Sequence, residues 1–165
     1  MIERHFIDDA VLQLRKLKDR TDKALAQVGD DQFGAALDND ANSIAVIMKH
    51  VAGNMRSRWT DFLASDGEKP TRNRDTEFEA AAADTRQSVT DAWNHGWDLT
   101  LNTIGSLTPD DLQKTVHIRS EGMSAMDAIQ RQMLHYAEHA GQIILLAKHF
   151  AGDRWQTLSI PKRRT

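Results

Sequence analysis

The sequence predicts an all-α protein whose core is a four-helix bundle. Four long segments carry apolar residues at helical spacing, and the chain of 165 residues has the length of one ordinary domain. Neither an internal repeat nor a low-complexity tract divides it, so we expect residues 1–165 to form a single domain. Amphipathic helices of this length bury their apolar stripes against one another, which favours a bundle.

The first two helices are predicted over residues 2–28 and 44–64. In the first, apolar side chains recur on one face with charged residues between them, and Gly29 stops the pattern. Asn42 and Ser43 precede the second helix, and such side chains cap a helix N-terminus by accepting a hydrogen bond from an unpaired backbone N–H group. The apolar residues of the second segment share one face, as an amphipathic helix requires.

The second half of the chain predicts a loop, two more helices and a hairpin. Residues 65–75 are rich in charge, contain Gly and Pro, and predict a loop that could cover one end of the domain. Helical periodicity resumes over residues 76–105. Residues 114–122 show a brief β-branched alternation and end in Gly, which predicts a short hairpin or turn before the last helix. Ser124 opens that helix, which runs to about Phe150.

The composition argues against several classes of function. With a net charge of -3, the chain has no bulk electrostatic attraction to nucleic acid or to an anionic membrane, and we expect neither as a partner. The apolar stretches are far shorter than the roughly 20 residues of a membrane span, and the N-terminus lacks an apolar signal core, so we expect a cytoplasmic protein. Cysteine is absent, which leaves histidine and carboxylates as the ligands suited to a tightly held metal.

The last predicted helix carries two histidines four residues apart, His135 and His139. This spacing puts both side chains on one helix face, with Cβ atoms about 5–6 Å apart, which suits two imidazoles that bind one metal ion. Gln132 and Gln142 extend a polar line through an otherwise apolar helix. The alternative interpretation is a pair of hydrogen-bonded histidines at the rim of the core.

His50 on the second predicted helix is the candidate third ligand. It stands one residue before Val51, a member of the apolar stripe, so it could face the same groove as the pair on the last helix. Three protein ligands leave a position open for water or substrate, which distinguishes a catalytic zinc-type site from a closed structural one. The alternative for His50 is an ordinary surface or hydrogen-bonded core histidine.

Residues 135–139 also read H-x-x-E-H, the inverted zincin protease signature, in which Glu138 would be the general base. That protease family needs a carboxylate ligand well downstream, but after His139 there is no Glu and the only Asp is Asp153. The protease interpretation therefore fails. Glu138 could still orient a ligand imidazole, and an exposed helix glutamate is the alternative.

The chain resembles the DinB-like superfamily of metal-binding four-helix bundles, which includes YfiT-like proteins and bacillithiol transferases. In that superfamily one histidine on the second helix and an H-x-x-x-H pair on the last hold the metal, and His50, His135 and His139 match them in order, spacing and helix. The resemblance extends along the whole bundle. Residues 42–75 and 141–162 look like a bacterial subgroup of unknown function.

The resemblance implies an up-down-down-up bundle, often dimeric, that holds a divalent ion such as zinc, nickel or iron. Better-understood relatives use the metal to bind a low-molecular-weight thiol and to transfer it or isomerise with it. The expected function is therefore a metal-dependent thiol S-transferase, isomerase or hydrolase acting on small electrophilic molecules. Bacillithiol, mycothiol and glutathione are candidate thiols, and we expect a small-molecule substrate and a homodimer.

Asn54 and Arg58 follow His50 by one and two helical turns and could bind polar or carboxylate groups of a cofactor or substrate. A hydrogen bond in a helix groove is the alternative for Asn54, and a solvated surface charge is the alternative for Arg58. The competing function is a non-catalytic protein in which the ion sets the packing of the second and last helices. An enzyme needs an open position that faces a pocket, whereas a structural site is closed.

Overall fold

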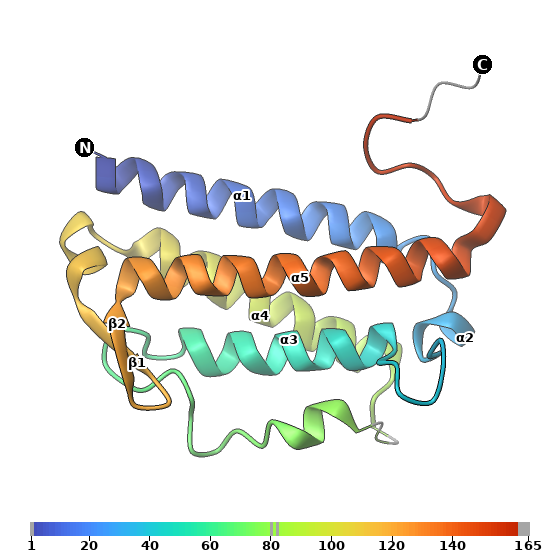
Figure 1. Ribbon diagram of the computed structural model, residues 1–165, viewed down its shortest axis with the longest axis horizontal. Coiled ribbons are helices and arrows are strands. Elements are labelled where there is room, and N and C mark those ends of the chain that lie inside the picture. Colours follow the sequence, from blue (N-terminus) through green and yellow to red (C-terminus); the bar gives the residue numbers. More distant parts are fainter. Residues whose placement is uncertain (1, 80, 82, 162–165) are drawn as a thin grey trace.

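The computed structural model of the chain describes residues 2–79, 81 and 83–161, which are mostly helical with a small two-stranded sheet (Figure 1). In chain order the elements are α1 (Ile2–Leu25), α2 (Asp30–Phe33), α3 (Ile44–Trp59), the 3-10 helix η1 (Asp75–Phe78), α4 (Arg86–Ser106), η2 (Pro109–Gln113), β1 (Thr115–Ile118), β2 (Glu121–Ser124), α5 (Ala125–Ala151) and η3 (Gly152–Arg154). The predicted helical class and the predicted hairpin are both confirmed.

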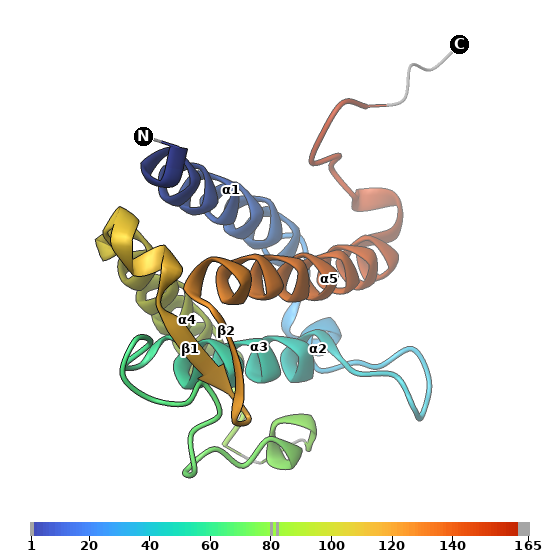
Figure 2. The same ribbon diagram turned by 60° about the vertical axis from the view of Figure 1, so that its left-hand side comes forward.

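The apolar stripes of the four long helices meet in one core. α1 and α3 each pack against both α4 and α5, so the core lies between all four (Figures 1 and 2). The largest fully buried side chains are Trp59, Trp93, Trp97, Tyr136, Ile7, Leu14, Ile44, Met48, Met55, Ile104, Leu112 and Ile129. Because fully burying one aliphatic or Phe side chain contributes roughly 1.5–3 kcal/mol, this core is the main source of stability.

Side-chain caps set where three of the long helices begin. Ser43 Oγ accepts from the backbone N–H of Val46 at 3.3 Å, and Ser124 Oγ accepts from that of Asp127 at 3.0 Å, so both predicted caps are confirmed. Thr85 caps α4 in the same way, through the backbone N–H of Ser88 at 3.1 Å. Each cap satisfies a backbone donor that the helix itself leaves unpaired.

Two helices end earlier than the periodicity predicts. α1 stops at Leu25 rather than near residue 28, and a turn follows. α3 stops at Trp59 rather than near residue 64, because Thr60 is extended and Asp61 has a left-handed φ of 49°. Phe62, beyond Trp59, reaches the core from a turn, which periodicity alone does not distinguish from helix.

The third long helix differs most from its prediction. Helical structure was expected from residue 76, but Asp75–Phe78 form a 3-10 turn and α4 begins only at Arg86, after the Thr85 cap. Residues 80 and 82 of the intervening alanine run lie outside the described residues. Alanine favours helix but brings little apolar area to a core, so helix propensity alone is a weak predictor of where α4 begins.

The hairpin is fastened to the loop that follows α3. Arg119 and Ser120 form its turn with positive φ values of 55° and 64°. The Asp66 carboxylate accepts from the backbone N–H groups of Arg119 at 2.9 Å and Ser120 at 2.7 Å, and the backbone N–H of Gly67 donates to the carbonyl of His117 at 2.7 Å. The predicted loop therefore closes over one side of the bundle together with the hairpin.

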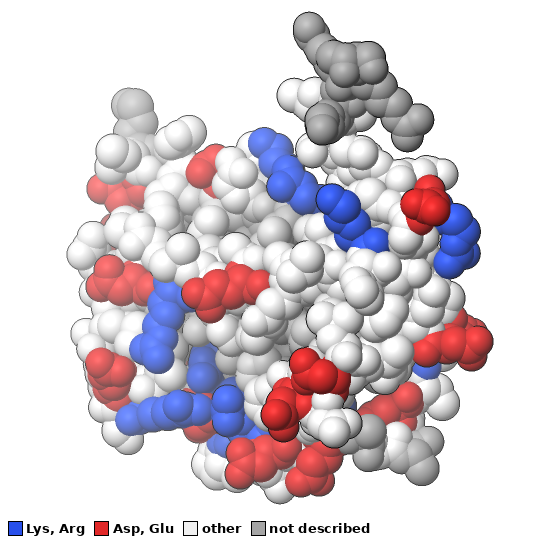
Figure 3. Space-filling view, turned by 45° about the vertical axis from the view of Figure 1, so that its right-hand side comes forward, with Lys and Arg blue, Asp and Glu red and all other residues white. Residues whose placement is uncertain are grey.

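The surface carries charges of both signs. Lys and Arg side chains lie among Asp and Glu side chains on the face shown in Figure 3. No helix among the described residues is long and apolar enough to cross a membrane.

Candidate metal centre

Three histidines from two helices converge between α3 and α5. One ligand nitrogen from each of His50, His135 and His139 lies within 4.8 Å of the other two. The ring centroid of His50 lies 5.5 Å from that of His135 and 5.0 Å from that of His139, and the two α5 rings are 4.6 Å apart. The faces predicted from helical spacing thus bring all three imidazoles into one group that could hold a metal ion.

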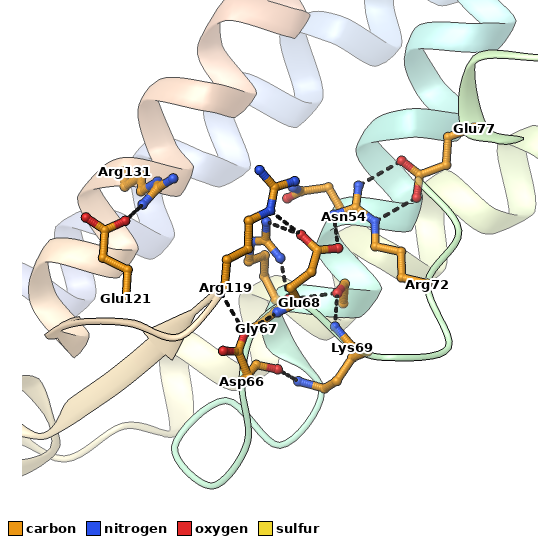
Figure 4. Close-up of polar contacts among 12 residues, drawn as sticks. Asn54, Asp66, Gly67, Glu68, Lys69, Arg72, Glu77, Arg119, Glu121 and Arg131 are labelled. Carbon is orange, nitrogen blue, oxygen red and sulfur yellow. Dashed lines mark hydrogen bonds and ion pairs between the residues drawn. The ribbon is translucent and has the colours of Figure 1, made fainter. Parts of the chain in front are cut away.

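His50 is oriented by a carboxylate from outside the helices. Its Nδ1 lies 2.9 Å from Glu77 Oε2, and both side chains are buried. Arg72 holds the same carboxylate through two hydrogen bonds, from Nε to Oε1 at 2.8 Å and from Nη2 to Oε2 at 2.7 Å (Figure 4). Burial opposes ionisation of Glu77, but the bonds from Arg72 and His50 outweigh it and lower its pKa. A carboxylate at Nδ1 leaves Nε2 of His50 for a metal.

Gly53 makes the approach of Glu77 to His50 geometrically feasible. A Cβ atom at position 53 would lie 2.2 Å from Glu77 Oε1 and 2.7 Å from its carboxyl carbon. Such a contact is far inside van der Waals distance, so any larger residue here would displace the carboxylate from His50. Glycine weakens a helix interior by roughly 0.5–1 kcal/mol relative to alanine. Here its missing side chain leaves the space that the Glu77 carboxylate occupies.

The two histidines on α5 are held mainly by their own helix. His135 Nε2 lies 3.1 Å from His139 Nε2, and His139 Nδ1 lies 2.9 Å from Gln142 Oε1. Burial lowers the pKa of His135 to about 3, with the neighbouring histidines and arginines adding to the effect, and burial also lowers the pKa of His139. Both imidazoles are therefore neutral near pH 7, which is the form that binds a metal.

An open cavity of about 200 Å³ adjoins the histidine group. Its lining residues are His50, Asn54, Arg58, Arg72, Arg74, Arg119, Arg131, Gln132 and His135. Two of the three histidines therefore face a space that a small molecule could enter. An open position beside the ligands is a feature of catalytic rather than closed structural metal sites.

Asn54 and Arg58, the two predicted substrate-binding residues, both line this cavity. Asn54 Oδ1 accepts from the Tyr136 hydroxyl at 3.2 Å, and that hydroxyl accepts from Trp59 Nε1 at 2.9 Å. Arg58 is buried rather than solvated, and its guanidinium donates to the Gly67 carbonyl and to a Glu68 carboxylate oxygen, the latter at 3.2 Å. Arg58 thus holds the loop in place as well as contributing charge to the cavity.

Glu138, which the sequence suggested as an orienting residue, is exposed on α5. Its charge acts on His139, but Glu77 is the carboxylate that hydrogen-bonds a histidine of the group. Sequence reasoning missed Glu77 and Arg72, because no spacing rule connects the predicted loop and the residues after it to His50. A glycine within the predicted second helix, one turn from His50, was the available signal of a close approach.

The donor set fits a divalent transition metal. Imidazole suits zinc, nickel and iron. Three histidines provide it without a cysteine, and burial lowers the pKa of two of them. The Glu77 carboxylate supplies the outer hydrogen bond that fixes a ligand histidine.

The chain matches the model of a known protein family. The model of the family described as "Protein of unknown function (DUF1572)" matches residues 1–164. No curated protein and no solved structure matches the chain. The family match covers nearly the whole sequence, helices and hairpin included. The chain therefore belongs to the DUF1572 family, whose function is unknown and which is part of the DinB-like clan.

Proposed function

We propose that the protein is a metal-dependent enzyme in which His50, His135 and His139 hold a divalent ion and a low-molecular-weight thiol is transferred to a small electrophile. The observation that carries the proposal is the convergence of three imidazoles beside an open cavity that two of them line. The DinB-like relationship supports the thiol chemistry. Isomerisation with the thiol, or hydrolysis if water takes its place, are variants of the same proposal.

In this proposal the metal ion activates the nucleophile, and the protein positions the ligands and the reactants. When bound, a divalent ion lowers the pKa of a thiol or water beside it and so supplies a nucleophile near neutral pH. In the transfer, the thiol sulfur forms a bond to the electrophilic carbon, the leaving group departs with the bonding electrons, and the thiol proton passes to solvent or to the leaving group. The chain orients His50 through Glu77 and shapes the cavity that receives the reactants.

We also propose that the four long helices form the up-down-down-up bundle of DinB-like proteins. The packing of α1 and α3 against α4 and α5 supports this arrangement. So does the course of the chain in Figure 1, where α1 and α5 run in one direction and α3 and α4 in the other.

A homodimer is a further part of the proposal. Leu134 and Leu145 on α5 are 68% and 65% exposed, and their separation of eleven residues places them close to one face of the helix. Exposed leucines on a shared face are suited to a second copy of the chain. Sedimentation velocity tests this part, and a monomer at working concentration would remove it.

The direct test is the metal content of protein purified without a histidine tag or added metal. We expect near-stoichiometric zinc, nickel or iron, and we expect His50→Ala to lower it about as severely as His139→Ala, because all three ligands are needed. His149→Ala, an exposed histidine on α5, is the matched control and should keep the metal. Full metal content in His50→Ala would refute the three-histidine site.

A second measurement separates an enzyme from a protein with a structural ion. Chelator treatment of an open functional site should lower the melting temperature modestly and abolish consumption of bacillithiol, mycothiol or glutathione in the presence of alkyl halides or epoxides. Unfolding on chelation, together with no thiol consumption by the loaded protein, would favour the non-catalytic alternative.

A further inference from the structure

The cavity beside the histidines is strongly basic. Five of its nine lining residues are arginines, namely Arg58, Arg72, Arg74, Arg119 and Arg131, and none is Asp or Glu. Guanidinium groups keep their charge in proteins and match the geometry of carboxylate and phosphate groups. The cavity thus contrasts with the mixed charges of the face in Figure 3 and with a chain whose net charge is -3.

Two of these arginines are already committed to the fold. Arg58 and Arg72 are buried and share the Glu68 carboxylate, at 3.2 and 3.3 Å, while Arg72 also holds Glu77. Their charges are therefore largely balanced within the protein, and Figure 4 shows the contacts between Arg72 and Glu77. They line the cavity but have little capacity for a new partner.

The other three arginines are exposed enough to reach a ligand, although Arg119 Nε also donates to Glu68 Oε2 at 3.1 Å. Arg74, Arg119 and Arg131 come from the loop, the hairpin turn and α5, and their side chains are 49%, 59% and 49% exposed. Arg74 and Arg131 have only distant carboxylate partners, at 3.8 and 3.6 Å, and those carboxylates are 90% and 73% exposed. Exposed pairs of this kind contribute little, so an incoming anion can replace them at low cost.

Unpaired buried atoms point to a missing occupant. Among the described residues, four buried side-chain atoms lack a hydrogen-bond partner, and three of them belong to residues that line this cavity: Arg58 Nε, Gln132 Oε1 and His135 Nδ1. Gln132 is only 4% exposed, so its oxygen has no ready access to bulk water. An unpaired buried polar atom costs folding free energy. The clustering of three such atoms at one cavity therefore indicates a site that a polar ligand completes.

We propose that the cavity binds a small organic anion, whose carboxylate or phosphate group is held by Arg74, Arg119 and Arg131 while its other end faces His50 and His135. Phe78 connects the two ends, since the Arg74 guanidinium lies 4.8 Å from its ring centroid and the His50 ring lies 4.6 Å from it on tilted planes.

The size of the cavity limits this anion. A volume of about 200 Å³ is below the roughly 300–1,000 Å³ of sites for drug-sized ligands, so the anion is a small acid or the acidic end of a larger molecule. If this anion is a reactant of the enzyme, that role rests on the proposed function. Binding by the arginines does not require the ion.

The test is calorimetric titration of the protein, as purified and after chelation, with sodium succinate, inorganic phosphate and the neutral analogue succinamide. We expect an anion to bind both preparations and succinamide to bind neither. The double variant Arg74→Gln/Arg131→Gln should weaken binding roughly ten- to a hundredfold, because bonds to charged groups are lost. Arg20→Gln, an exposed arginine on α1, is the matched control and should change binding by less than about twofold.

The outcomes separate this inference from the proposed function. Tighter succinate binding assigns the site to a carboxylate, and tighter phosphate binding assigns it to a phosphate; both support the anion site. Absence of anion binding, equal binding of succinamide, or an unchanged affinity in a folded double variant would overturn it. Loss of anion binding on chelation would show that the metal ion, and not the arginines, binds the anion, and would overturn the inference. Anion binding by protein that takes up no metal would sustain this inference while refuting the proposed function.

Discussion

The two halves of the histidine group are supported in different ways. His50 on α3 is buried and fixed by Glu77, which Arg72 clamps in turn, so residues far along the chain determine its orientation. The pair on α5 is half-buried, and its one side-chain support, Gln142, is a neighbour on the same helix. One half depends on tertiary structure and the other on helix geometry.

This difference predicts which substitutions will weaken the site. A helix keeps the spacing of its own side chains wherever it packs, so the α5 pair survives changes in the rest of the fold. The orientation of His50 survives only while the segment around η1 stays in place. We therefore expect loss of the residues that support His50 to affect both folding and metal affinity, and loss of Gln142, which supports the α5 pair, to affect neither strongly.

The largest effect is expected for Glu77→Ala. Removal of this carboxylate leaves Arg72 buried with Glu68 as its remaining partner, and breaking a buried ion pair in this way costs about 3 kcal/mol in the free energy of unfolding. Loss of the hydrogen bond to His50 should also weaken metal binding about 10- to 100-fold. Urea denaturation and competition with a chromophoric chelator measure the two effects.

Gln142→Ala is the matched change on the α5 side. Because Gln142 is exposed and local, metal affinity should stay within about twofold of the parent protein, and Glu138→Ala should behave alike. If Gln142→Ala weakened metal binding as much as Glu77→Ala, the two halves would be equally supported and the comparison would fail.

An intermediate effect is expected for Gly53→Ala. The new methyl group would overlap Glu77, so the carboxylate must leave His50 and metal affinity should fall about tenfold. Gly141→Ala on α5 is the control, since nothing lies within 4 Å of the added Cβ. That variant should keep its metal affinity and gain roughly 0.5–1 kcal/mol of stability from helix propensity. Equal affinities in the two glycine variants would show that Glu77 does not position His50.

The smallest effect is expected for the pH dependence of stability at Asp111, which lies outside both halves of the histidine group. Asp111 accepts from Lys114 and from the backbone and side chain of Thr108, which lowers its pKa to about 2 from the ordinary 3.8. Its stabilising contribution is therefore present above about pH 3.8 and is lost as the pH falls toward 2. Asp111→Asn should lower the melting temperature at pH 7, and the difference should shrink as the pH falls toward 2.

Metal content at pH 7 should be unchanged in Asp111→Asn, which separates loosening of the fold from loss of the site. The exposed neighbour Asp110→Asn is the control and should melt like the parent protein. A melting difference that persisted unchanged to pH 2 would show that the Asp111 charge is not its source.

The sequence was sufficient for features that depend on local spacing. Ser43 and Ser124 were identified as caps, residues 114–122 as a hairpin, and His135 with His139 as neighbours on one face, because each follows from a few adjacent residues. The placement of His50 followed from helix packing. These features need no knowledge of how distant segments meet.

The features that were missed depend on contacts between distant segments. Glu77 stood in a predicted helix, but its bonds to Arg72 and His50 belong to a 3-10 turn, and α4 starts only at Arg86. The convergence of Arg74, Arg119 and Arg131 involves three segments whose arrangement no periodicity encodes. The helical frame was thus predictable, whereas the wall of the cavity was not.

The fastening of Asp66 to the hairpin turn has a consequence for protein engineering. The loop and the hairpin form one unit that lines part of the cavity, and the three histidines stand on α3 and α5, outside that unit. Residues 66–74 and 117–121 can therefore be exchanged together as a cassette, provided that Arg72 is kept to hold Glu77 beside His50. Such a graft would redesign what the cavity accepts without rebuilding the helices that carry the histidines.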